Sequence, residues 1–210
     1  MKYQTDEFKN SQIESYKENP SRFVQSKMMF FVEYLTERAF DLFTEQSAKY
    51  LGELLRTKGF FTAPGSTKYH DSYEGGLFEH SMRVTDNLLI LTEKLNLKWT
   101  RPCSPVVVGM FHDLCKLDQY TKNEDGFFVY NKATLLNGHG EKSVIVAEQC
   151  GINLTEEEML CIRYHMGAYE GDKSWDCLGK AIETYPNILF THLADILDSR
   201  DVNDVIRNLI

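Results

Sequence analysis

The sequence predicts an all-α fold with one small β-hairpin. Apolar residues recur at helical spacing along most of the 210 residues, whereas strand-like patterning is confined to one short stretch. Apolar residues make up 42% of the chain and charged residues 26%, which is typical of a soluble globular protein with a full core. We find no internal repeat and no low-complexity segment.

Residues 1–58 are expected to form an N-terminal helical segment. The first twenty residues are polar and end at Asn19-Pro20, which favours a loosely held segment or a short helix. From Ser21 to about Lys58 the pattern predicts one or two helices, ended by Gly59. A stripe of apolar residues there predicts packing rather than chemistry: Phe23, Met28, Phe31, Leu35, Phe40, Phe43, Leu51 and Leu54.

Residues 59–210 are expected to form a second, larger domain. It opens with a loop, residues 60–76, that is rich in Gly and Ser. An amphipathic helix follows from Leu77 to about Leu95. Residues that step by three or four share its inward face: Leu77, His80, Val84, Leu88, Leu91 and Leu95.

The next helix carries a His-Asp pair at its end. Ser104 suits its N-cap and Pro105 its first helical position. Residues 106–110 are apolar nearly all round, which predicts a buried helix. A carboxylate taken out of water costs several kcal/mol unless it is paired or bound to a metal. The pair His112-Asp113 therefore calls for a partner, and a divalent cation is the simplest one.

The rest of the chain predicts a hairpin and three helices. Residues 119–131 are typical of a hairpin with its turn at Asp125-Gly126. One helix opens at His139 and stops at Gly151, and the next begins at a capping box, residues 155–158. Residues 168–176 are expected to be a loop. In the last helix, after Pro186, one side holds Ile188, Thr191, Asp195 and Asp198.

Histidines and aspartates occur in a distinctive order. Singly, each is more often a core or surface residue than a metal ligand, and a lone His-Asp dipeptide is a weak signal. The complete ordered set is a strong one: His80, His112, Asp113, His139, His165 and Asp195, with Lys116 three residues after Asp113.

This order resembles the HD superfamily of metal-dependent phosphohydrolases, in particular its two-metal branch. The residues from Phe60 through His80 further resemble the entrance to the HD domain of bacterial 3′-to-5′ exoribonucleases, and the resemblance extends to about Asp198. It implies an HD-type helical bundle. With the helices predicted above, five of the six candidate ligands lie on helices.

The resemblance also implies roles for the residues. His80, His112, Asp113 and Asp195 would hold one metal ion, while Asp113 would bridge to a second, held also by His139 and His165. Mixed nitrogen and oxygen ligands suit Mn, Fe, Co, Ni or Zn better than Mg. Asp113 and Lys116 would act in catalysis, with Lys116 reaching the phosphate as a point charge.

The function expected is hydrolysis of a phosphomonoester or phosphodiester by a metal-activated water, the substrate being a nucleotide or short oligonucleotide. The alternatives are an HD-type di-iron oxygenase and a 3′-to-5′ exonuclease on single strands. The net charge of −8 argues against long nucleic acid as partner, because such binding needs many Lys and Arg contacts to phosphates. The pattern leaves the oligomeric state open.

The compartment expected is the cytoplasm. The chain shows no secretory signal and no apolar run long enough to span a membrane. Its five cysteines are odd in number and contain no C-x-x-C pair, so we expect reduced thiols.

Overall fold

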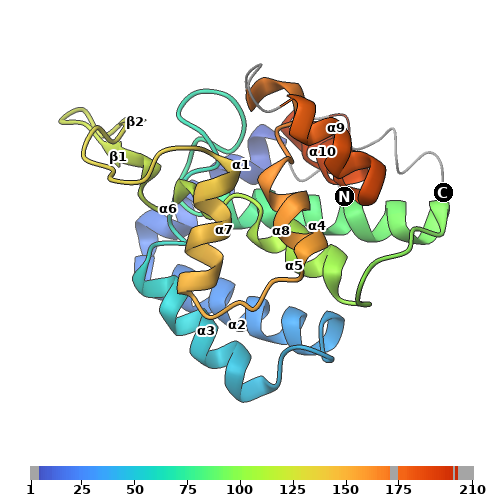
Figure 1. The fold of residues 1–210 in the computed structure, drawn as a ribbon. Coiled ribbons are helices and arrows are strands. Elements are labelled where there is room, and N and C mark those ends of the chain that lie inside the picture. Colours follow the sequence, from blue (N-terminus) through green and yellow to red (C-terminus); the bar gives the residue numbers. More distant parts are fainter. Residues whose placement is uncertain (1–4, 171–174, 201, 203–210) are drawn as a thin grey trace. The chain divides into compact units, whose positions relative to one another are not determined.

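The computed structural model describes residues 5–170, 175–200 and 202. Its elements are helical except for one two-stranded sheet, which confirms the predicted fold class (Figure 1). The chain divides into two compact units. The first comprises Met1–His80 and Lys116–Leu135, and the second comprises Ser81–Cys115 and Leu136–Ile210.

Helices of the first unit surround an aromatic core. Helix α2 (Pro20–Arg38) packs against α1 (Asp6–Glu18) and α3 (Glu45–Thr57). Phe31 and its fully buried neighbours Phe60 and Phe61 meet edge to face. The prediction of Phe40 as a core residue is wrong. Helix α2 ends at Arg38, so Phe40 falls in the turn that follows and is 77% exposed.

The predicted hairpin is present in the first unit. After the short helix α6 (Lys116–Gln119), strand β1 (Tyr120–Lys122) pairs with β2 (Phe128–Tyr130) in antiparallel register, Thr121 opposite Val129. Gly126 adopts a φ of 82°, the left-handed conformation that the tight turn requires.

Helix α4 (Gly76–Leu95) runs from the first unit into the second, and the division falls directly after His80. Its predicted inward face is buried along most of the helix, including Leu77, Val84 and Leu88. Leu95, expected on that face, is 52% exposed because it is the last helical residue.

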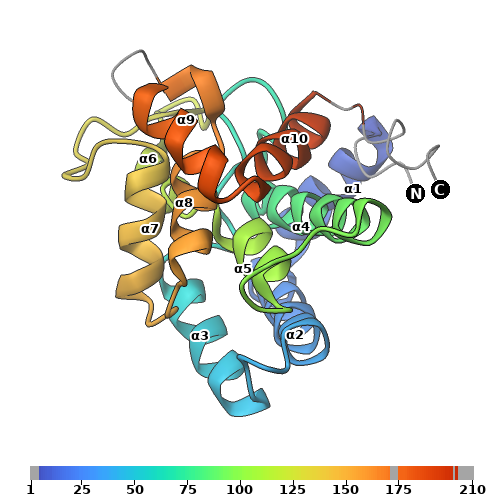
Figure 2. The same cartoon turned by 45° about the vertical axis from the view of Figure 1, so that its right-hand side comes forward.

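The second unit is built around α8 (Glu156–Arg163), which packs against α5 (Ser104–Phe111), α7 (Gly140–Gln149) and α10 (Asn187–Ser199). Figure 2 shows α7 and α8 side by side. A 3₁₀ turn, η1 (Gly167–Glu170), follows α8. Helix α9 (Trp175–Thr184) was not expected, and its first residues replace the end of the predicted loop 168–176.

The buried carboxylate of Glu158 joins α8 to the start of α5. Thr155 and Glu158 form the predicted capping box. The same carboxylate accepts hydrogen bonds from Arg101 at 2.8 and 2.6 Å and from Ser104 Oγ at 2.7 Å. The prediction of Ser104 as N-cap is therefore wrong: it is the first helical residue, and its hydroxyl is turned to Glu158 instead of the helix amides.

The four side chains predicted to lie on one side of α10 are buried: Ile188, Thr191, Asp195 and Asp198. Within the described residues, no helix is both long enough and apolar enough to cross a membrane.

Candidate metal centre

The predicted ligands lie mainly at helix ends. His112 is the C-cap of α5 and Asp113 follows it, His139 is the N-cap of α7, and His165 lies two residues beyond α8. His80 in α4 and Asp195 in α10 lie within helices. The expectation of five helical ligands is wrong, because only His80 and Asp195 lie within helices. The other four lie just before or just after a helix.

Two of these helix ends hold an imidazole in the same way. His112 Nδ1 lies 2.8 Å from the carbonyl oxygen of Gly109, and His165 Nδ1 lies 2.7 Å from that of Ile162. Each carbonyl is three residues back, in the last turn of a helix, where carbonyl groups lack partners within the helix. A carbonyl can only accept, so Nδ1–H donates, and the lone pair of each neutral ring is at Nε2. Metal-binding histidines are commonly fixed by such a bond.

The Nε2 atoms converge on the carboxylate of Asp113. His139 Nε2 lies 2.8 Å and His165 Nε2 lies 3.6 Å from Asp113 Oδ1, while His112 Nε2 lies 3.4 Å from Oδ2. The two oxygens of Asp113 thus face different imidazoles. This is the arrangement that a carboxylate bridging two metal ions would have.

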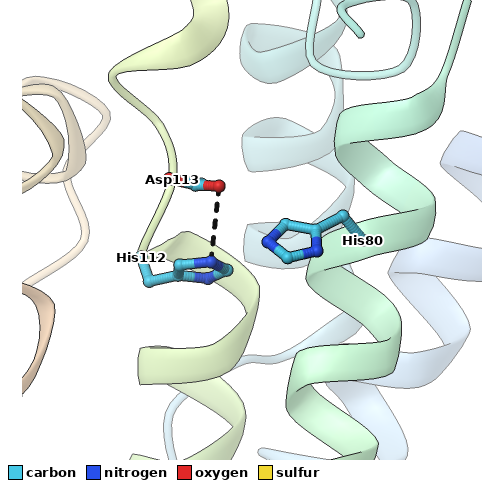
Figure 3. Close-up of side chains that lie close together, drawn as sticks. All are labelled: His80, His112 and Asp113. Carbon is cyan, nitrogen blue, oxygen red and sulfur yellow. Dashed lines mark ion pairs between the residues drawn. The ribbon is translucent and has the colours of Figure 1, made fainter. Parts of the chain in front are cut away.

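The remaining two predicted ligands are Asp195 in the second unit and His80 at the end of the first unit. Asp195 Oδ1 is 4.0 Å from His112 Nε2. His80 is fully buried on α4, at the end of the first unit. In Figure 3, His80 is drawn on α4, and a dashed line marks the ion pair of His112 and Asp113 at the end of α5.

Divalent metal ions fit these residues. Asp113, His139 and His165 form a group whose ligand atoms lie within 4.8 Å of one another. His165 Nε2 is buried, and the described chain offers it no hydrogen bond. Burial alone would lower the pKa of the His165 imidazole, but the carboxylates of Asp113 and Asp195 outweigh it and raise the pKa above its ordinary value. A cation at this point would satisfy both the nitrogen and the carboxylates.

Two glycines that sequence reasoning missed allow these ligands to meet. A Cβ on Gly140 would lie 2.1 Å from the carbonyl oxygen of Arg163, so α7 can begin there only without a side chain. A Cβ on Gly109 would lie 2.6 Å from Cα of Thr85. Gly109 thus brings α5 close to α4, and Gly140 brings His139 close to the end of α8. An isolated glycine inside the apolar run 106–111 was the available signal.

Cys115 packs against one of the predicted ligands. Its sulfur lies 3.3 Å from Nδ1 and 3.8 Å from Nε2 of His139. If the sulfur accepted a hydrogen bond in line with Nδ1–H, it would lie much farther from Nε2 than from Nδ1. The two distances are similar, so the thiol lies against the face of the imidazole ring. The cysteines of the described residues are free thiols, and Cys115 is fully buried.

Several other charged residues of the chain are buried or have partners. Arg163 forms an ion pair with Glu141. Asp198 is fully buried and accepts two hydrogen bonds from Arg83, at 2.6 and 3.1 Å. Lys116 is buried at the start of α6, in the first unit. Its assignment to the substrate phosphate stays a prediction.

The comparisons with known proteins include a phosphodiesterase. No family model matches the chain, and no solved structure matches it. The chain is similar to a dihydroneopterin 2′,3′-cyclic phosphate phosphodiesterase of Methanocaldococcus jannaschii, with 30% identity over 148 residues. The match covers 68% of this chain and 53% of that protein, so the chain spans about half the length of this relative.

Proposed function

We propose that the chain is an HD-type, metal-dependent phosphodiesterase that hydrolyses a small phosphodiester. The observation that carries the proposal is the convergence of three imidazole nitrogens on the two oxygens of buried Asp113. The relative is named for the hydrolysis of a phosphodiester in a cyclic phosphate, which favours hydrolysis over the di-iron oxygenase alternative.

The ligand set proposed comprises His80, His112, Asp113, His139, His165 and Asp195, with Asp113 shared between two ions. Divalent ions held there would supply Lewis acidity toward the phosphoryl oxygens and would lower the pKa of water. The carboxylates of Asp113 and Asp195 would offset two of the four positive charges of two dications. The helix-end carbonyls hold His112 and His165 with Nε2 directed at the site, so little reorganisation accompanies binding.

Lys116 is proposed to contact the substrate phosphate. It follows Asp113 by three residues, and its ammonium can offset the charge of a phosphodiester without a fixed geometry. The proposed boundary of the HD domain is residue 59, and residues 1–58 are proposed to be an additional helical segment.

A substrate comparison tests this function. The purified chain would be supplied in turn with Mn²⁺, Fe²⁺, Co²⁺ and Mg²⁺ and given a 2′,3′-cyclic nucleotide, a dinucleotide and a long single-stranded RNA at one salt concentration. We expect metal-dependent opening of the cyclic phosphate and poor activity on the long strand, because the net charge is −8. Degradation of the long strand alone would favour the exonuclease. Oxygen uptake by an iron-loaded protein with no phosphodiester hydrolysis would favour the oxygenase.

A further inference from the structure

We infer that Tyr169 and His192 form an aromatic subsite that binds a planar heterocyclic ring of the substrate, of the nucleobase or pterin type. The inference rests on the proposed function, because it places this ring beside the predicted metal ligands. We call the side chains of Tyr169 and His192 the aromatic subsite.

The imidazole of His192 is tied to two predicted ligands. Its Nδ1 donates a hydrogen bond to the backbone carbonyl of His165 at 2.6 Å. On α10 it precedes Asp195 by three residues, which places the two on neighbouring turns of one face. A molecule in contact with His192 therefore lies about one helical turn from Asp195, one of the ligands proposed for the site of hydrolysis.

Gly167 covers one face of this imidazole. A Cβ on Gly167 would lie 3.0, 3.1 and 3.2 Å from Cε1, Nε2 and Nδ1 of His192. Because these three distances to ring atoms are nearly equal, the Cβ position of Gly167 lies over the face of the His192 ring and not beyond its edge. Gly167 also has a φ of 57°, a conformation in which side chains are strained. The hydrogen bond and this contact together fix the orientation of the half-buried His192 ring.

The short turn η1 then presents Tyr169 beside His192. The two ring centroids are 6.5 Å apart, with an angle of 45° between the ring planes. Tyr169 is 68% exposed, so most of its ring remains available for contact. Stacking on an aromatic side chain suits any planar ring and needs no charge, which fits an acidic protein.

Substituting Tyr169 tests the inference. We would measure kcat and KM of the metal-loaded protein on a 2′,3′-cyclic nucleotide and on glycerol 1,2-cyclic phosphate, which lacks a base. Loss of one stacking contact corresponds to roughly 10-fold weaker binding. Tyr169→Ala should therefore raise KM about tenfold for the nucleotide and leave kcat and the glycerol substrate unchanged. Tyr169→Phe keeps the ring and should behave as the unaltered protein.

Tyr50→Ala is the matched control, because Tyr50 is 73% exposed on α3 in the first unit. It should change neither substrate's KM. An equal effect of Tyr169→Ala on both substrates, or no effect on either, would overturn the aromatic subsite.

Calorimetric binding of a nucleoside 3′-monophosphate separates this inference from the proposed function. If the nucleotide binds Tyr169→Ala about tenfold more weakly than the unaltered protein, the aromatic subsite is supported. If neither protein then hydrolyses a phosphodiester, only the phosphodiesterase proposal fails. Normal turnover with unchanged nucleotide binding and KM refutes the subsite alone. Absence of both turnover and nucleotide binding refutes both.

Discussion

Adding one methyl group at Gly140 should weaken the metal centre. The Cβ of Gly140→Ala would lie 2.1 Å from the carbonyl oxygen of Arg163, whereas ordinary contacts begin at 3.4 Å, so the start of α7 must move by about 1.3 Å. A backbone carbonyl cannot swing aside as a long side chain can. His139 precedes Gly140, and its imidazole lies 5.1 Å from that of His165, centroid to centroid. The shift therefore separates two predicted ligands.

The expected cost has two parts. Overpacking destabilises by about 1–3 kcal/mol, and the helix propensity of alanine offsets up to about 1 kcal/mol of this loss. Displacing a metal ligand through its surroundings lowers metal affinity by about 10- to 100-fold. We therefore expect a folded Gly140→Ala variant, about 1–2 kcal/mol less stable, that binds its second metal ion at least tenfold more weakly.

Calorimetric titration with Mn²⁺, combined with denaturant unfolding, measures both effects. Gly179→Ala is the matched control, because a Cβ at Gly179 in α9 meets nothing within 4 Å. It should leave metal affinity unchanged and stabilise the protein by up to about 1 kcal/mol. Unchanged metal affinity in Gly140→Ala would refute the reasoning that this close contact positions His139.

Three further outcomes are expected. In metal titrations, His139→Ala and His165→Ala should abolish the weaker of two binding steps and leave the tighter one; loss of both steps together would contradict separate sites. With a thiol reagent at pH 8, the exposed Cys177 should react quickly. Cys161 should react only on unfolding, because burial raises the pKa of its thiol. Rapid labelling of Cys161 in the native protein would contradict its burial. In denaturant titrations, Glu158→Ala should lower the free energy of unfolding by about 3 kcal/mol, because the donors Arg101 and Ser104 lose their buried acceptor. A loss below about 1 kcal/mol would show that this network contributes little to stability.

The fold class was predictable from the sequence because its signals are local. Helical periodicity, the Asp125-Gly126 turn and the capping box at Thr155 each involve a few neighbouring residues, and the structure confirms each one. Helix α9 was missed because its polar and aromatic beginning resembles a loop. Phe40 was misassigned because the periodic pattern continues past the residue at which α2 ends.

The candidate site was predictable in part. The order of histidines and aspartates named four residues that the second unit brings together, although their roles stay proposals: His112, Asp113, His139 and His165. Which atoms face each other depends on helix ends that no periodic pattern reveals. The carbonyls of Gly109 and Ile162 fix two imidazoles, and this requires the helices to stop where they do. The close contact at Gly140 joins segments more than twenty residues apart, so the sequence alone offered no measure of it.

Metal content per chain, measured for the unaltered protein and for Asp113→Ala, tests the central claim most directly. Asp113 lies between the imidazoles of His112 and His139, with one oxygen toward each. We predict two metal ions per chain after loading with Mn²⁺ or Fe²⁺, and loss of most of that metal in the folded Asp113→Ala variant. Full occupancy of the Asp113→Ala variant, with its helical content unchanged, would contradict the account.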